Sequence, residues 1–179
     1  MDEQVLTGLA VAGALAAVIV CGLYLSWRAT RLHRLHQRMD RSRAGLGAAL
    51  HRRRETALRL ARALGREHRS DLLTAAVAAD GGEHAESALS RALRRTLADP
   101  AARRTADTAG LVSAAAAAAR GVQLARVFHN AAVADIRRAR RSRTVRLFRL
   151  AGGVPMPDFF EIDDLPPDAS AAVPSSGIR

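Results

Sequence analysis

The stretch that decides the fold is Val5 to Trp27, VLTGLAVAGALAAVIVCGLYLSW, which carries no charged side chain. As an α-helix rising about 1.5 Å per residue, it is about 34 Å long, enough to cross a hydrocarbon core of about 30 Å. A cleaved signal peptide, the main alternative, requires a basic segment ahead of a shorter apolar core and small residues at its cleavage site. This chain begins with Met1-Asp2-Glu3-Gln4 and the run ends in Tyr24, Trp27 and Arg28, so we predict a transmembrane helix over 5–27.

Arginine residues on one side of this run predict its orientation. The residues that follow it are Arg28, Arg31, Arg34, Arg38, Arg41 and Arg43, and no basic side chain precedes it. Basic residues beside a membrane span favour the cytoplasmic side. We therefore expect a single-pass protein of the cell membrane, with residues 1–4 outside and the bulk of the chain in the cytoplasm.

Apolar residues recur at helical spacing through the rest of the chain. Between Arg28 and His68 they stand three, four or seven positions apart, at Leu32, Leu35, Met39, Leu46, Leu50, Ala57, Leu60 and Leu64. This spacing places them on one helix face, so we expect the transmembrane helix to run on into the cytoplasm as one long helix, weakest at Gly45 and Gly47. Two short helices follow, one capped by Asp71 and one over 83–97. A long helix is expected from Asp99-Pro100 to about residue 150.

The predicted fold class is all-α, with a single N-terminal transmembrane helix followed by a long antiparallel helical bundle of two long and two short helices. Its parts are the N-terminus over 1–4, the span over 5–27, a cytoplasmic bundle over 28–153 and a tail over 154–179. The Pro- and Asp-rich tail begins after Gly152-Gly153, which end the last helix. We expect disorder after about residue 164.

Charge is arranged unevenly along the chain. All 28 basic residues are Arg, and the formal net charge is +11. Residues 137–149 hold seven Arg and no acid, whereas 158–168 hold five acids and no base. An antiparallel bundle returns the second Arg run to the membrane beside the first, as one basic collar against the inner leaflet, where each basic residue contributes about 1 kcal/mol on anionic lipid. The acidic tail is expected either to fold back on this collar or to compete with lipid for it.

The predicted anionic-surface-binding residues are Arg28, Arg31, Arg34, Arg137, Arg138, Arg140, Arg141, Arg143 and Arg146. Anionic lipid head groups are the expected ligand. Nucleic acid, the alternative, is not favoured because aromatic side chains are not interleaved with the Arg residues. A solvated basic face, typical of an Arg-rich proteome, is the third interpretation.

Catalytic and metal-binding patterns are not recognisable in the sequence. The single cysteine, Cys21, lies in the apolar run, and His33 and His36 share a helix turn whose Arg neighbours repel a cation. The sequence has no P-loop, no Rossmann glycine pattern and no G-x-S-x-G motif. We therefore expect no enzyme activity, no metal and no cofactor.

The later half of the chain carries a partial motif. Arg126, His129, Asn130 and Val133, followed by Gly153, Phe160 and Glu161, resemble the closing pattern of the LemA family. The resemblance implies an N-terminal transmembrane helix and a helical bundle. It implies no activity, because the family's biochemical role is not established. His129 stands where the family has Tyr, Ile136-Arg137 replaces its second Tyr-Asn pair, and Arg143-Thr144 replaces its Phe-Pro step.

Four of these residues share one side of the expected helix. We expect Val133 and His129 to face the bundle. We expect Arg126 and Asn130 to bond to carbonyls or acids on a neighbouring helix, as a structural polar network rather than a ligand site.

The sequence thus predicts a non-enzymatic protein, a membrane-anchored scaffold or partner-binding module at the inner membrane face with a protein partner that the sequence does not identify. Peripheral binding of anionic lipid or nucleic acid through the Arg-rich surface is the alternative.

Overall fold

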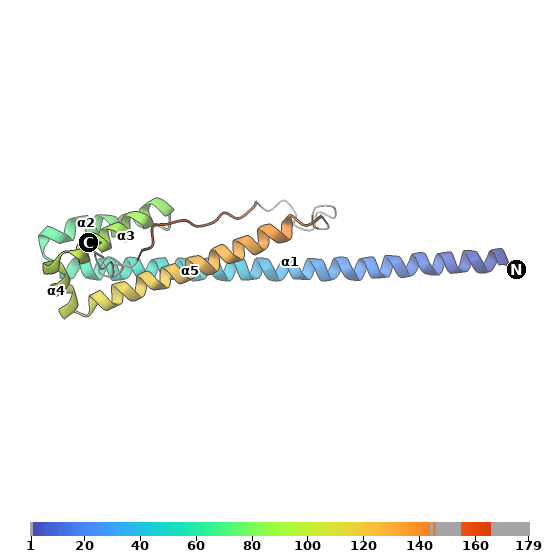
Figure 1. The fold of residues 1–179 in the computed structure, drawn as a ribbon, viewed down its shortest axis with the longest axis horizontal. Helices are drawn as coiled ribbons and strands as arrows, with labels where there is room; N and C mark the ends of the chain where they lie inside the picture. Colours follow the sequence, from blue (N-terminus) through green and yellow to red (C-terminus); the bar gives the residue numbers. More distant parts are fainter. Residues whose placement is uncertain (1, 144, 146–154, 166–179) are drawn as a thin grey trace, which may run out of the picture.

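The fold consists of helices, as the sequence predicts. The computed structural model describes residues 2–143, 145 and 155–165, and helices are the only regular elements in this part. They are α1 (Asp2–Ala63), α2 (Arg66–Ala78), α3 (Glu83–Ala98), α4 (Pro100–Thr108) and α5 (Leu111–Arg140) (Figure 1). The all-α class is confirmed.

Helix α1 is continuous for 62 residues and sets the length of the molecule. Its N-terminal part projects alone, and α5 runs antiparallel beside the rest of it (Figure 1). Gly45 and Gly47 do not interrupt it. Among the described residues, two helices could cross a membrane by length and composition, α1 from Leu6 and the segment Leu111–Arg141. The apolar window of α1 is fully exposed, whereas that of the α5 segment is partly buried.

The long first helix that the sequence predicts ends at Ala63, and α2 begins at Arg66. The Arg69 side chain donates to the carbonyls of Ala61, Arg62 and Leu64 at 3.1–3.2 Å. It thereby satisfies carbonyls that the end of α1 leaves without partners. The predicted cap at Asp71 is wrong: Asp71 lies inside α2 and its carboxylate pairs with Arg95 at 2.7 Å.

The predicted long helix from Pro100 to about residue 150 is wrong too, because it is divided into α4 and α5. Its start is as predicted, since the Asp99 carboxylate accepts from the Ala101 N–H at 3.1 Å. Gly110 then adopts a φ of 67°, a left-handed conformation that ends a helix at low cost only for glycine. Helix α5 ends at Arg140, before Gly152-Gly153, which lie outside the described residues. The part of the chain that the structure describes therefore has two long and three short helices.

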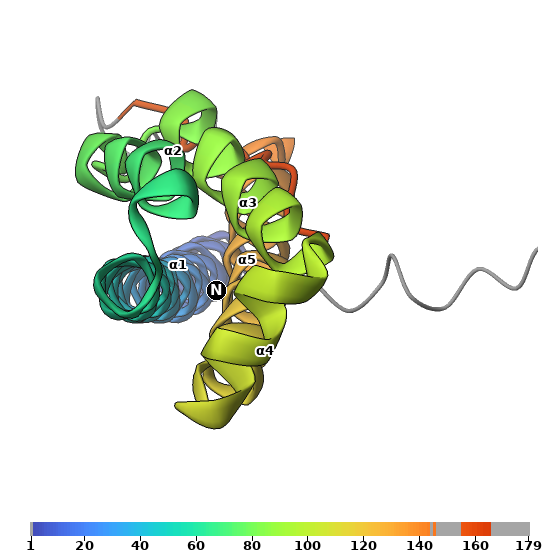
Figure 2. The same ribbon diagram turned by 90° about the vertical axis from the view of Figure 1, so that its left-hand side faces the viewer.

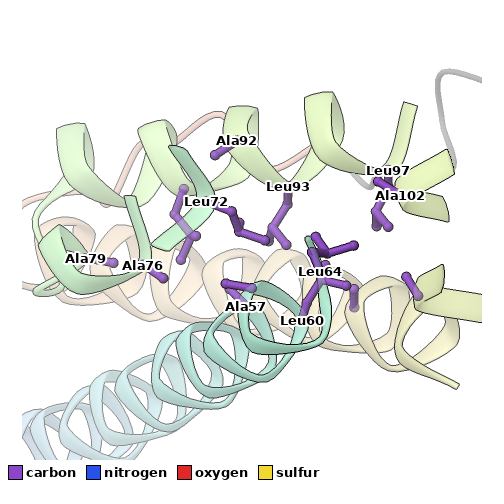
Figure 3. Packing of buried hydrophobic residues seen from close by; sticks show 14 residues of the cluster. Ala57, Leu60, Leu64, Leu72, Ala76, Ala79, Ala92, Leu93, Leu97 and Ala102 are labelled. Carbon is purple, nitrogen blue, oxygen red and sulfur yellow. The ribbon is translucent and has the colours of Figure 1, made fainter. Parts of the chain in front are cut away.

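The main core lies at the end of the bundle farthest from the N-terminus. Seen from that end, α2 and α3 lie together against the α1–α5 pair, and α4 links α3 to α5 (Figure 2). Leucine and alanine side chains from all five helices meet there (Figure 3). Leu60, Leu72 and Leu89 have no exposed surface. The alanines allow the helices to approach closely, which explains why so few large side chains fill this core.

A buried ion pair lies beside the core. The Arg53 guanidinium of α1 bonds to the Glu86 carboxylate at 2.5 Å and to the Ser90 hydroxyl at 2.6 Å. Both charged side chains are only 2% exposed. The other oxygen of Glu86 accepts from the Gly81 N–H at 3.1 Å, which ties the turn between α2 and α3 to α1.

Residues 155–165 form an extended segment, here called the strap, which runs back along the bundle (Figure 1). Its Phe160 and Ile162 pack on a second, smaller core of Leu46, Ala49, Leu50 and Val122. The strap belongs to the tail for which we expected disorder beyond about residue 164. Residues 166–179, on which most of that prediction falls, lie outside the described residues.

Candidate functional site

The two Arg runs meet where α1 leaves its apolar stretch. The Arg28 side chain of α1 donates to the Ser142 hydroxyl at 2.9 Å, and Arg38 pairs with Asp135 of α5 at 3.3 Å. These two contacts fix the register of α5 against α1. They place the end of α5 directly after Trp27, at the level that the sequence predicts for the membrane surface.

A cavity of about 410 Å³ lies between these two segments. Its polar lining includes Arg28, Arg31, Arg38 and Arg138, against Asp135 as the only acid. The Arg28 Nε atom is buried and has no hydrogen-bond partner in the described part of the chain. Four guanidinium groups around one carboxylate leave an excess of positive charge, a chemistry suited to a phosphate or carboxylate.

Aromatic residues border this basic end. The rings of Tyr24 and Trp27 lie 6.3 Å apart, and the Arg31 guanidinium lies 5.8 Å from the centre of the Trp27 ring. Tyr and Trp are enriched at membrane interfaces because one part of each ring is apolar and another is polar. The order along α1 is therefore an apolar helix, then an aromatic pair, then arginines.

The nine arginines of the predicted basic collar do not share one environment. Arg31, Arg34, Arg138, Arg141 and Arg143 are exposed. Arg28 is half-buried in the cavity, and Arg146 lies outside the described residues. Arg137 and Arg140 contact the strap instead of the cavity.

The strap begins at the basic collar and continues away from it. Arg137 donates to the Pro157 carbonyl and to the Asp158 carboxylate, each at 2.8 Å, and its guanidinium lies 4.7 Å from the Phe159 ring centre. Arg140 donates to the Pro155 carbonyl at 3.0 Å. Of the two arrangements that we considered for the acidic tail, the described part of it folds back on the collar.

Farther along the bundle the strap is held by two more ion pairs. Asp164 accepts from Arg126 of α5 at 2.6 Å, and Asp163 accepts from Arg94 of α3 at 2.5 Å. The hydrogen bond from Arg94 holds the pKa of Asp163 below its ordinary value, against the opposing effect of burial. Three acids of the strap thus neutralise arginines on two helices.

The residues that carry the family resemblance lie together. The Asn130 side chain exchanges two hydrogen bonds with the Phe160 backbone, at 2.9 and 3.1 Å. The Glu161 side chain is exposed, and its backbone N–H donates to Glu83 at 2.7 Å. Val133 is fully buried, as expected. Gly153 lies outside the described residues.

One expectation about these residues is wrong. Arg126 and Asn130 bond to the strap and not to a neighbouring helix. Val122, four residues before Arg126, packs on Leu46, Ala49 and Leu50 of α1 together with Phe160 and Ile162 of the strap, so this side of α5 meets both α1 and the returning chain. His129 does face inward, since it is 6% exposed. Burial lowers the pKa of its imidazole, and the charge of Arg43 lowers it further, against the opposing effect of a hydrogen bond that the ring donates to the Asp158 backbone.

Two further residues, Arg43 and Arg94, were not predicted as site residues, since Arg43 served only to predict the orientation of the span. Arg94 holds the strap, and Arg43 lines a separate cavity with His129. Nothing distinguishes either from its many Arg neighbours in the sequence. Within the described ranges, no group of three or more His, Cys, Asp or Glu side chains is placed to hold a metal ion.

The site has to be interpreted from its own geometry. No family model, no curated protein and no solved structure matches this chain.

Proposed function

We propose that this chain is a single-pass membrane protein whose cytoplasmic helical bundle serves as a scaffold or partner-binding module, without catalytic activity. One observation carries the proposal: the apolar part of α1 projects with its window fully exposed, and it ends where the arginines of α1 and α5 meet. Membership of the LemA family, which the motif residues suggest, is part of the same proposal.

The anchor is supported by what the projecting helix exposes. Leu6, Leu9, Val18 and Leu23 each expose about two thirds of their surface, and no described helix covers this part of α1 (Figure 1). Apolar surface of this extent is unfavourable in water and favourable in hydrocarbon. Protease added to sealed spheroplasts tests the topology. The bundle should be digested only after lysis, whereas digestion in intact spheroplasts would contradict the proposal.

Partner binding is supported by an exposed apolar stripe on α5. Leu124, Val127 and Phe128 stand three and four residues apart on one face and are each more than half exposed. Such a stripe suits the apolar face of a partner helix. Crosslinking in intact membranes should capture a protein with the native chain and lose it with Phe128→Ser. Val77→Ser, which changes an equally exposed apolar residue on α2, is the matched control and should retain the partner.

Contact with anionic lipid is the second candidate function. The cavity between Arg28 and Arg138, beside Trp27, is the observation that favours it. Full-length protein released from nanodiscs should retain phosphatidylserine in preference to phosphatidylcholine, measured by native mass spectrometry. Arg31→Gln with Arg138→Gln should abolish the preference. Arg103→Gln with Arg104→Gln, at exposed positions on the distal α4, makes the same change of charge and should leave the preference unchanged. Equal retention of both lipids by the native chain would exclude this function.

A further inference from the structure

A second cavity, here called the strap groove, lies between the middle of α1, α5 and the strap. Its volume is about 590 Å³, within the range of about 300–1,000 Å³ that is usual for small-molecule sites. Met39, Leu46 and Leu50 of α1 line one side, and Met156, Phe159 and Phe160 of the strap line the other. The apolar part of a small ligand would therefore contact apolar side chains on two sides of the groove.

The groove also contains one cation without a counter-charge. Arg43 is exposed, and none of the ion pairs within the described ranges includes it. The only carboxylate in the lining, Asp158, pairs with Arg137 at 2.8 Å. An unpaired guanidinium beside an apolar wall favours a ligand with an anionic head.

The imidazole of His129 supplies a second polar feature. Its Nδ1 atom is buried and has no hydrogen-bond partner among the described residues. Buried polar atoms are nearly always bonded, to protein, water or ligand. Because burial lowers its pKa, this imidazole is neutral at neutral pH and leaves the charge of the groove to Arg43.

Gly47 keeps one wall of the groove open. It lies inside a helix, and a Cβ atom built on it has no neighbouring heavy atom within 4 Å. A large side chain at this position would extend into the groove without meeting the backbone. Gly45, two residues earlier, has the same open surroundings but does not line the groove.

From these features we propose that the strap groove binds an organic anion with an apolar body, such as an alkyl carboxylate. The alkyl chain lies along Met39, Leu46 and Phe160, and the carboxylate is held by Arg43. Met39 stands twelve residues beyond Trp27, about 18 Å along the helix, so the groove opens to water and not to the bilayer. The ligand is therefore taken up from solution. This site is separate from the basic collar and does not depend on lipid binding there.

Photolabelling of the full chain tests this proposal. The probe is decanoate carrying a diazirine, added to protein in phosphatidylcholine nanodiscs, with the labelled peptides identified by mass spectrometry. Label should appear on peptides from 39–50 or 155–165 and be displaced by unlabelled decanoate. Gly47→Leu should reduce this label at least tenfold, whereas Gly45→Leu should leave it unchanged. Both substitutions replace a glycine inside a helix by a better helix former. Loss of folding would therefore not explain a difference in labelling between the two variants.

The charge of Arg43 is tested in the same assay. Arg43→Gln should weaken labelling by the carboxylate about tenfold, the effect expected for one charge-assisted hydrogen bond, and should not change labelling by the methyl ester of the probe. Equal labelling of Gly47→Leu and Gly45→Leu would overturn the proposal. So would label confined to residues 5–27, or an Arg43→Gln variant that labels like the native chain.

Discussion

The buried pair of Arg53 and Glu86 provides the sharpest test of what stabilises the bundle. Both side chains are 2% exposed, and their charged atoms are 2.5 Å apart. Removing one partner leaves the other charge buried and unpaired. Replacing both by neutral groups removes the charges together. The substitutions are Arg53→Met and Glu86→Gln, and the Gln retains an oxygen that can accept from the Gly81 N–H.

The size of the effect follows from burial. Breaking a pair of this kind costs about 3–5 kcal/mol, whereas replacing it by neutral residues of similar volume costs little. Each single variant should therefore lower the melting temperature by about 6–20 °C, since 1 kcal/mol corresponds to about 2–4 °C for a chain of this size. The double variant should recover most of that loss. Thermal unfolding of the full chain in nanodiscs, followed by far-ultraviolet circular dichroism, measures all three.

An exposed pair provides the matched control. Arg95 and Asp71 also lie within hydrogen-bonding distance, but both side chains are more than 60% exposed. Arg95→Met should change the free energy of unfolding by less than about 1 kcal/mol. The reasoning is refuted if the destabilisations by Arg53→Met and Glu86→Gln simply add in the double variant, because the two charges would then not be coupled in the folded state.

Three more predictions concern the strap and the helix boundaries. Asn130→Ala removes both bonds to the strap backbone and should speed hydrogen exchange of strap amides about tenfold while leaving α3 amides unchanged. Because Arg94 lowers the pKa of Asp163, stabilisation by this pair is complete above the ordinary pKa of 3.8 and is lost as the pH falls through the lower folded value. A pH titration by nuclear magnetic resonance should show the Asp163 region of the strap unchanged down to pH 3.8, and release near neutral pH would contradict this. Gly110→Ala, at a φ of 67°, should destabilise the bundle by about 1 kcal/mol, whereas Gly121→Ala inside α5 should stabilise it slightly in the same thermal assay.

The presence of the helices was predictable from the sequence, because the spacing of apolar residues indicates which face of a helix is buried. Every residue of the predicted face of α1 from Leu32 to Leu64 is buried or half-buried in the structure. The helix boundaries were not all predictable. The end of α1 depends on Arg69 reaching back to three carbonyls, and nothing in the sequence separates this arginine from its neighbours. The division at Gly110 was a matter of backbone conformation, which a single glycine permits but does not require.

The Arg53–Glu86 pair left a detectable signal that the sequence analysis passed over. The apolar positions of the first helix show a gap of seven between Leu50 and Ala57, and Arg53 occupies the missing position on that face. A charge at a core position requires a buried partner of opposite sign. The sequence identified the position, but it could not identify Glu86, because the partner comes from a different helix.

The positive charge of the candidate site was predictable from the sequence, but the contacts between its side chains were not. An antiparallel bundle places the ends of its two long helices together, so the meeting of Arg28 with the segment after α5 follows from the topology. The path of the strap could not be predicted from the topology. It is held by hydrogen bonds between side chains and backbone groups, such as that from Asn130 to the Phe160 carbonyl, and no regular sequence spacing indicates such bonds. The strap groove depends on that path, which explains why Arg43 and His129 were not associated with each other beforehand.

The strap changes how charge is distributed along the molecule. Its acids pair with Arg137, Arg126 and Arg94, which lie progressively farther from the apolar end of α1. The exposed arginines at the collar, such as Arg31 and Arg138, receive no acid from the described strap. Asp158 pairs with Arg137 at the collar, whereas Asp163 and Asp164 pair with arginines farther from it, so positive charge remains beside Trp27. This excess of positive charge at one end is the arrangement that the proposed contact with anionic lipid requires.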